Sequence, residues 1–123
     1  MDINMEISLY DTDGRPTMYV AEDGESIYSW DGYAVCYLAD EEIYSWRGDH
    51  RGWLLDGIVY DLDGYRVGYV REASPHILFA ESTKWTKKTK WTKSIRGKAK
   101  TRPTLKGFDS RKNLAEYLSH DHP

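Results

Sequence analysis

Hydrophobic and polar residues follow the same order four times within the first 70 residues of the chain. Each copy begins with an aliphatic residue and a tyrosine, continues through a polar stretch that contains a glycine, and ends with an aromatic and an aliphatic residue. The glycines are Gly14, Gly32, Gly48 and Gly64, so the copies are 18, 16 and 16 residues apart. Self-similarity at a nearly fixed period indicates that one small structural unit is arrayed.

Each copy is typical of a β-hairpin. Three copies carry Asp-Gly at the turn, the dipeptide that favours a type I′ turn because both central residues then have positive φ. Arg47-Gly48 in the third copy fits that turn less well. A two-residue loop at Asp13-Gly14 places Leu9 opposite Met18 and Tyr10 opposite Thr17.

The two faces of these hairpins differ because successive side chains of a strand alternate. One face is aliphatic and is the predicted core; it contains Ile7, Leu9, Met18, Val20, Ile27, Cys36, Leu38, Ile43, Leu54, Val59 and Val70. Gly52 and Gly68 on this face indicate either crowding around a shared centre or a bulge. The other face is a candidate aromatic binding face, covered by another part of the protein or exposed to a partner: Tyr10, Tyr19, Tyr28, Trp30, Tyr37, Tyr44, Trp46, Trp53, Tyr60 and Tyr69.

The third and fourth copies carry Gly48-x-His50-x-Gly52-Trp53, Asp56-Gly57, Tyr60-Asp61-x-Asp63-Gly64 and Val67-Gly68. In these elements the chain resembles the bacterial four-fold β-flower domain family, over about residues 7–73. The resemblance implies four hairpins around a pseudo-four-fold axis, and it implies no particular chemistry. Arg51 departs from it, since an aliphatic residue is expected there.

Charge divides the chain into two predicted regions. Residues 1–80, the four-hairpin β domain, have a net charge of −11, whereas residues 81–123 have a net charge of +8. Such asymmetry is typical of an interaction tail. The predicted fold is therefore all-β, with four hairpin repeats in a pseudo-four-fold array, a basic extended segment and a short C-terminal helix.

Within the tail, Lys84-Trp85-Thr86-Lys87 returns six residues later as Lys90-Trp91-Thr92-Lys93, and its Thr and Trp content favours an extended conformation. Residues 76–80 are a possible closing strand. A helix is expected near the end, with Asp109 or Ser110 as its cap and an apolar stripe formed by Leu114, Tyr117 and Leu118.

Three ordered arrangements of the tail remain open, besides disorder. It lies across the acidic body of its own chain, it lies on a neighbouring subunit, or it binds an anion, with nucleic acid as the first candidate. Lysines neutralise phosphates and tryptophans stack on unpaired bases. The candidate anion-binding residues are Lys84, Trp85, Lys87, Lys88, Lys90, Trp91 and Lys93.

Signals for catalysis are weak. His50 near Asp49 is expected to be a hydrogen-bonded residue after a turn, and His76 a linker residue. His120 and His122 are two ligands without a third, so no metal and no cofactor is expected. The only cysteine, Cys36, lies on the predicted core face, which fits a reducing compartment such as the cytoplasm. Neither a signal peptide nor a membrane span is visible.

We therefore expect a non-enzymatic binding or assembly module, in which an acidic aromatic β body engages a basic segment in cis or in trans. The expected partners are the chain's own tail or a second copy in a homo-oligomer, with no membrane involved. The alternative function is nucleic-acid binding through the Lys/Trp-rich tail.

Overall fold

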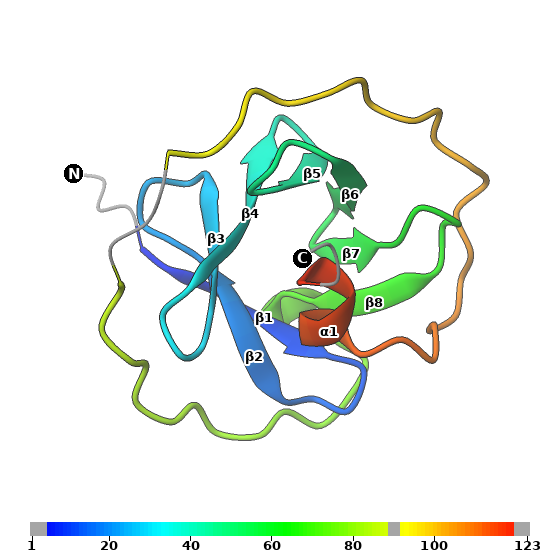
Figure 1. Ribbon diagram of the computed structural model, residues 1–123. Coiled ribbons are helices and arrows are strands. Elements are labelled where there is room, and N and C mark those ends of the chain that lie inside the picture. The colour runs from blue at the N-terminus through cyan, green and yellow to red at the C-terminus, as the bar shows by residue number, and fades with distance from the viewer. Residues whose placement is uncertain (1–4, 89–91, 120–123) are drawn as a thin grey trace.

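The computed structural model describes residues 5–88 and 92–119 and contains a closed antiparallel barrel (Figure 1). Every strand pairs with its neighbours in the sequence, and the last strand pairs with the first. The predicted four-hairpin, all-β array is thus confirmed. The strands are β1 (Ile7–Asp11), β2 (Pro16–Val20), β3 (Ser26–Ser29), β4 (Ala34–Ala39), β5 (Glu42–Ser45), β6 (His50–Leu55), β7 (Ile58–Tyr60) and β8 (Arg66–Tyr69).

The hairpin turns differ from the predicted type I′ geometry. Leu9 does pair with Met18, but Tyr10 then pairs with Pro16, so the register shifts before the turn. The Asp11 N–H donates to the Arg15 carbonyl oxygen, which leaves a three-residue connection. Its only residue with positive φ is Gly14, at 84°. The predicted two-residue loop is therefore wrong. Only the glycine of each connection needs a left-handed conformation, so Arg47 in the third copy causes no backbone strain.

Type I′ geometry occurs between the hairpins instead. Asp56 and Gly57 connect β6 to β7, and both have positive φ, 53° and 79°. This Asp-Gly pair has the conformation that the sequence suggested for the turns within the hairpins.

The core fills the inside of the barrel. Leu9, Ile27, Ile43 and Val59, at matching positions of the four hairpins, are fully buried. Ile7 was expected in the core but is 49% exposed. The reason is that β1 pairs with β8 only at Tyr10 and Asp11, so the start of β1 has no strand on that side.

Crowding explains the two core-face glycines. A Cβ atom on Gly52 would lie 2.2 Å from the Tyr60 carbonyl oxygen, and one on Gly68 would lie 2.9 Å from a methyl carbon of Leu114. Both glycines also lie beside the register shift of their hairpin. The missing side chain therefore leaves room for the neighbouring strand β7 at Gly52 and for the C-terminal helix at Gly68.

After the short 3₁₀ helix η1 (Arg71–Ala73), residues 74–88 and 92–113 run around the outside of the barrel (Figure 1). We call this segment the strap. In its described residues it contains no helix or strand, so the closing strand predicted at residues 76–80 is absent. The chain then turns into α1 (Leu114–Leu118), whose Leu114 and Leu118 are fully buried in the core.

Helix α1 is shorter than predicted and begins later. Asn113 is its N-cap, and the Asn113 side-chain oxygen accepts a 3.0 Å hydrogen bond from the Glu116 N–H. Asp109 and Ser110 therefore do not cap it. None of the helices within the described parts of the chain has the length and apolar character to cross a membrane.

Candidate functional site

The strap approaches the barrel closely at the four hairpin turns. A Cβ atom added to any of the four turn glycines would lie 2.1–2.5 Å from a strap carbonyl oxygen. The approached carbonyls are those of Ile77 at Gly14, Thr86 at Gly32, Ile95 at Gly48 and Thr104 at Gly64. They are nine residues apart, so the strap has a period of its own that matches one hairpin per nine residues.

Backbone hydrogen bonds keep the same period. Each turn glycine accepts, at its carbonyl oxygen, an N–H from the strap residue two positions after the close approach. These bonds run from Phe79 to Gly14 (2.9 Å), Lys88 to Gly32 (3.1 Å), Gly97 to Gly48 (2.7 Å) and Lys106 to Gly64 (2.9 Å). Each turn glycine thus holds the strap in two ways. Its missing side chain lets the strap backbone approach, and its carbonyl oxygen accepts a hydrogen bond from a strap N–H.

The sequence contains a signal of this period that the six-residue Lys-Trp-Thr-Lys duplication conceals. Ser or Thr recurs every nine residues, and a basic residue follows it in four of the five copies. The copies begin Ser74-Pro75, Thr83-Lys84, Thr92-Lys93, Thr101-Arg102 and Ser110-Arg111. This pattern was missed in the sequence analysis. It places one basic side chain at each of three seams, where a seam is the line along which the adjacent strands of two neighbouring hairpins pair.

The aromatic face lies between the barrel and the strap. Its rings form one cross-strand pair at each seam between neighbouring hairpins: Tyr19 with Tyr28, Tyr37 with Tyr44, Trp53 with Tyr60, and Tyr69 with Tyr10. Seven of the ten candidate residues are buried, and Tyr28, Trp30 and Trp46 are half-buried. The face is therefore covered, and its role in binding a partner stays a prediction.

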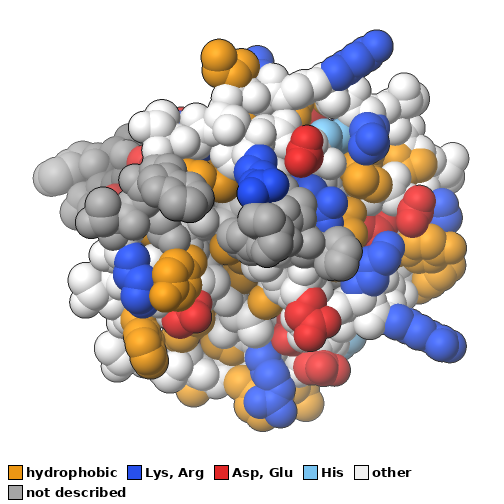
Figure 2. Space-filling view, viewed as in Figure 1, with side chains coloured by type: hydrophobic (Ala, Val, Ile, Leu, Met, Phe, Trp, Pro, Cys, Tyr) orange, Lys and Arg blue, Asp and Glu red, His pale blue; other side chains and the backbone are white. Residues whose placement is uncertain are grey.

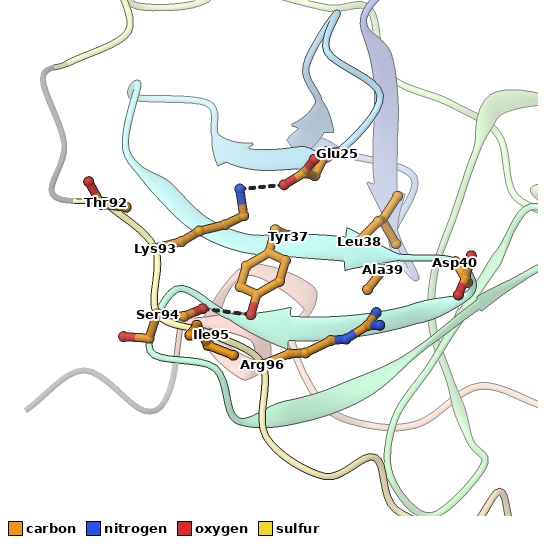
Figure 3. A pocket seen from close by; sticks show the side chains of 10 residues that line it. All are labelled: Glu25, Tyr37, Leu38, Ala39, Asp40, Thr92, Lys93, Ser94, Ile95 and Arg96. Carbon is orange, nitrogen blue, oxygen red and sulfur yellow. Dashed lines mark hydrogen bonds and ion pairs between the residues drawn. The ribbon is translucent and has the colours of Figure 1, made fainter.

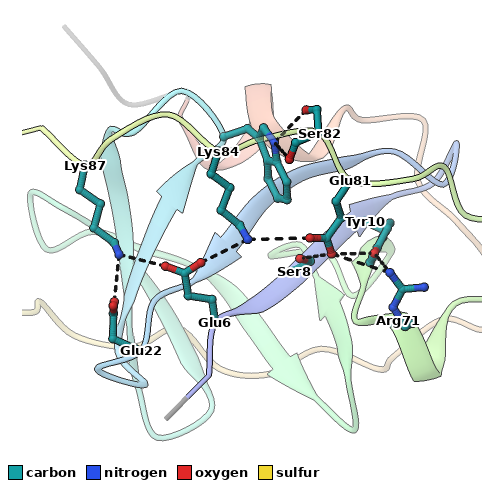
Figure 4. A network of polar contacts seen from close by, with 10 residues as sticks. Glu6, Ser8, Tyr10, Glu22, Arg71, Glu81, Ser82, Lys84 and Lys87 are labelled. Carbon is teal, nitrogen blue, oxygen red and sulfur yellow. Dashed lines mark hydrogen bonds and ion pairs between the residues drawn. The ribbon is translucent and has the colours of Figure 1, made fainter. Parts of the chain in front are cut away.

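At the seam between β2 and β3, two strap lysines lie over the aromatic rings. Figure 4 shows these lysines, Lys84 and Lys87, with their carboxylate partners. The Lys84 ammonium is 5.0 Å from the centre of the Tyr19 ring and 3.2 Å from a Glu6 carboxylate oxygen. Lys87 bonds to Glu6 at 3.0 Å and to Glu22 at 2.9 Å. Burial opposes the charge of Lys87, but the hydrogen bonds to Glu22 and Glu6 outweigh it and raise the Lys87 pKa.

The seam between β4 and β5 repeats this arrangement (Figure 3). The Lys93 ammonium lies 5.3 Å from the centre of the Tyr37 ring and pairs with Glu25. The hydrogen bond to Glu25 raises the Lys93 pKa. The Tyr37 hydroxyl donates a 2.8 Å hydrogen bond to the Ser94 carbonyl oxygen.

The third seam is more apolar. Arg102 pairs loosely with Glu41, at 3.7 Å, while Leu105 packs against Trp53 and Tyr60. The strap therefore supplies a cation with a carboxylate partner at three successive seams, and the cation lies over the aromatic rings at the first two.

The fourth seam, between β8 and β1, is where the strap begins and ends. His76 from its start lies 2.8 Å from a carboxylate oxygen of Asp109 near its end. The Tyr69 hydroxyl donates to the same carboxylate, and burial together with this bond raises the pKa of Tyr69 to about 12. His76, predicted as a linker residue, thus helps to close the strap into a ring.

The candidate anion-binding residues split into three groups. The described lysines all contact the barrel, including Lys88, whose ammonium donates a 2.6 Å hydrogen bond to the Asp31 carbonyl oxygen. The Trp85 side chain is 65% exposed, although the Trp85 backbone N–H donates to the Trp30 carbonyl oxygen. Lys90 and Trp91 lie outside the described residues. Nucleic-acid binding by this group stays a prediction.

His50 is buried, and both of its ring nitrogens bond to the backbone. Nε2 lies 2.9 Å from the Gly52 carbonyl oxygen, and Nδ1 accepts a 2.8 Å hydrogen bond from the Lys100 N–H. These partners assign a neutral ring with its proton on Nε2. Burial lowers the His50 pKa. The ring thus fastens the strap through backbone partners at both nitrogens, and His50 is the hydrogen-bonded residue after a turn that the sequence predicts.

The C-terminal helix is fastened by two residues that break the repeat. The Arg51 guanidinium donates a 2.7 Å hydrogen bond to the Tyr117 carbonyl oxygen and lies over the Tyr117 ring. The Tyr117 hydroxyl accepts from the Leu62 N–H and donates to the Arg51 carbonyl oxygen, so it bridges two strand ends. Arg51 departs from the expected aliphatic residue because it binds the last turn of α1.

Neither clustered metal ligands nor an exposed thiol occurs among the described residues. Within residues 5–88 and 92–119, His, Cys, Asp and Glu side chains form no group of three that could hold a metal ion. Cys36 is buried, with its Sγ 3.3 Å from the Leu118 carbonyl oxygen. His120 and His122 lie outside the described residues.

These features define a class: a closed barrel of four repeated hairpins whose turn glycines hold an encircling strap. The family model described as "4-fold beta flower protein" matches residues 7–118, and the chain belongs to this family. The match includes the strap and α1, beyond the residues 7–73 to which the sequence resemblance extended. No curated protein and no solved structure matches the chain.

Proposed function

We propose that the protein is a non-enzymatic binding and assembly module whose acidic, aromatic barrel engages a basic strap. The observation that carries this proposal is the nine-residue register between the strap and the four turn glycines. A register kept over four turns is the behaviour of a receptor surface that holds an extended peptide.

The contacts at the seams support the same function. Strap cations meet carboxylates of the barrel over aromatic rings, so charge and ring geometry both select a basic segment. In the proposed assembly the barrel holds the strap of its own chain in cis, or the strap of a second copy in trans. A reducing compartment such as the cytoplasm suits the single, buried cysteine.

The test reverses the charge of strap lysines in the full-length protein. Lys84→Glu/Lys93→Glu places carboxylates beside Glu6 and Glu25 and is expected to lower the melting temperature and to speed tryptic cleavage of the strap. Lys98→Glu/Lys100→Glu is the matched control, because these side chains are exposed and make no ion pair with a described residue. Equal effects of the two double variants would refute the proposal.

The mass in solution separates the two arrangements. Light scattering is expected to give a monomer for a strap held in cis and a dimer or larger assembly for a strap held in trans. A dimer that dissociates in the Lys84→Glu/Lys93→Glu variant would identify the exchanged form.

The second candidate function, nucleic-acid binding through Lys84–Lys93, has less support. The ammonium groups of Lys87, Lys88 and Lys93 already contact carboxylate or carbonyl oxygens of the barrel. These oxygens compete with phosphates for the ammonium groups. If this segment reads nucleic acid, Lys84→Glu/Lys93→Glu abolishes binding to a single-stranded oligonucleotide at about 50 mM salt.

A further inference from the structure

The third hairpin turn differs from the other three in charge. Asp13, Asp31 and Asp63 precede the turn glycine in the first, second and fourth units, whereas Arg47 precedes it in the third. Because the connection has three residues and only the glycine has positive φ, this arginine is not required by the backbone. Its charge needs an explanation other than turn geometry.

The strap changes at the same place. At the second and fourth turns the strap residue bonded to the glycine is a lysine, Lys88 or Lys106. Its ammonium donates to the carbonyl oxygen of the turn aspartate, at 2.6 Å and 3.0 Å. At the third turn the matching strap residue is Gly97, which carries no charge. The cation is instead Arg47, which lies in the turn at the position of the aspartates.

Four cations around this turn have no charged or hydrogen-bonded partner in the described part of the chain. Arg47, Arg96, Lys98 and Lys100 are all exposed, and none of their charged groups makes an ion pair or hydrogen bond with a described residue. The backbone brings them together, because Gly97 bonds to Gly48 and Lys100 bonds to His50. Most other described strap cations, in contrast, are paired: Lys84, Lys87, Lys88, Lys93, Arg102, Lys106 and Lys112.

The surface between these cations is open. Lys98 and Lys100 line a hollow of about 300 Å³ together with Asp49, the one carboxylate on its wall. Arg96 lines the neighbouring hollow of about 550 Å³ together with the carboxylates Glu25 and Asp40 (Figure 3). Lys and Arg side chains also project from the rim along which the later part of the strap runs (Figure 2). The four cations outnumber Asp40 and Asp49, the carboxylates of the two hollows that make no ion pair with a described residue.

We infer that this patch, formed by Arg47, Arg96, Lys98 and Lys100, binds the phosphate backbone of duplex nucleic acid. Arg96, Lys98 and Lys100 occupy alternate strap positions, and a row of cations fits a polyanion whose charge repeats evenly. No exposed aromatic side chain of the described residues belongs to the patch, so it offers phosphate contacts without base stacking. High charge density then favours a duplex over a single strand.

The inference rests on the docked strap of the proposed function, because docking brings Arg96, Lys98 and Lys100 to Arg47. The experiment uses the full-length protein and fluorescence anisotropy with a labelled duplex of roughly 20 base pairs at about 50 mM salt. With four phosphates contacted, the logarithm of affinity falls with the logarithm of salt concentration with a slope of about −3.6.

The decisive variant is Arg47→Asp, which restores the residue type of the other three turns. It is expected to weaken duplex binding at least about fivefold and to reduce the salt slope by about 1. Arg111→Asp removes the same charge from an exposed strap arginine outside the patch, and it should leave affinity within about twofold. Lys98→Glu/Lys100→Glu should reduce the salt slope by about 2.

Several results would overturn the inference: no duplex binding by the wild-type protein, equal losses in Arg47→Asp and Arg111→Asp, or tighter binding of a single strand or of a labelled Glu-rich peptide than of the duplex. The melting temperature reports separately on the strap. If Lys84→Glu/Lys93→Glu lowers the melting temperature while the wild-type protein binds no duplex, the patch fails and the strap docking stands.

Discussion

The barrel and the strap are held in place by different kinds of contact. The barrel buries its aliphatic residues completely and closes its hydrogen-bond ladder into a ring. No described residue of the strap between 74 and 113 is buried, yet it follows the barrel in register over four turns. A repeated surface can therefore position a long segment through backbone contacts and ion pairs, without a core of its own.

The difference predicts unequal stability. Regions with few buried apolar contacts open locally at low free energy, whereas core strands open only on global unfolding. The strap should open before the barrel, while α1 keeps its end anchored through Leu114 and Leu118.

The largest effect is expected from a core isoleucine compared with a strap isoleucine. Ile43→Ala removes a fully buried side chain and should lower the free energy of unfolding by about 2–5 kcal/mol. Ile95→Ala changes a side chain that is 94% exposed and should stay within about 0.5 kcal/mol. Urea denaturation of both variants measures this, and similar losses would remove the contrast between the two regions.

The second effect concerns the turn glycines. Gly32→Ala imposes a side chain at φ 96° and places its Cβ 2.4 Å from the Thr86 carbonyl oxygen. Gly24→Ala is the matched control, since Gly24 has φ 72° and no atom within 4 Å of an added Cβ. The control should cost about 1–2 kcal/mol from backbone strain alone.

Gly32→Ala should exceed that cost and also release the strap to trypsin, which cleaves after Lys84 and Lys87. Thermal melts and limited proteolysis of both variants provide the measurements. If Gly24→Ala exposes the strap as much as Gly32→Ala does, the close approach at the turn is not what holds it.

A smaller effect compares two strap ion pairs. Lys112 pairs at 2.5 Å with Asp61, whose side chain is fully buried. Burial opposes the charge of Lys112, but the hydrogen bond to Asp61 and the surrounding negative charges together raise the Lys112 pKa. Lys112→Met leaves the Asp61 carboxylate with only backbone donors and should cost about 1–3 kcal/mol. Lys93→Met breaks an exposed pair with Glu25 and should cost less than about 1 kcal/mol. Equal costs would show that burial of the partner carboxylate does not decide the strength of these pairs.

The smallest expected effect is pH-dependent. Burial lowers the His50 pKa, so the folded protein binds fewer protons at this site than the unfolded chain does. The stability from neutral His50 is present above its ordinary pKa of about 6.5 and is lost progressively as the pH falls below it.

Denaturation at pH 7.5 and at pH 5 measures this loss. His50→Asn should remove the part of the pH dependence that His50 supplies, and NMR should show the Lys100 amide exchanging faster in the variant. A variant with the same pH dependence as the wild-type protein would assign the effect to other groups.

The hairpin array was predictable because its signals are side-chain signals. Aliphatic residues at matching positions must enter one core, as Leu9, Ile27, Ile43 and Val59 do. The turn type was not predictable in the same way. Asp-Gly fits both a type I′ turn and a three-residue connection in which the aspartate keeps negative φ.

The strap was harder to predict because the backbone determines its register. N–H and carbonyl groups of Phe79, Lys88 and Gly97 occupy equivalent places although their side chains share nothing. Only the weak recurrence of Ser/Thr followed by a basic residue marks the period in the sequence. The sequence left open whether the aromatic face is covered or exposed, because the segment that covers it is positioned by this hidden register.

Amide hydrogen exchange along the strap, followed by NMR, tests the central claim most directly. We expect protection from exchange to recur every nine residues, at the amides of Phe79, Lys88, Gly97 and Lys106. Uniformly fast exchange from residue 74 to 113, or protection without this period, would contradict the claim that the turn glycines hold the strap.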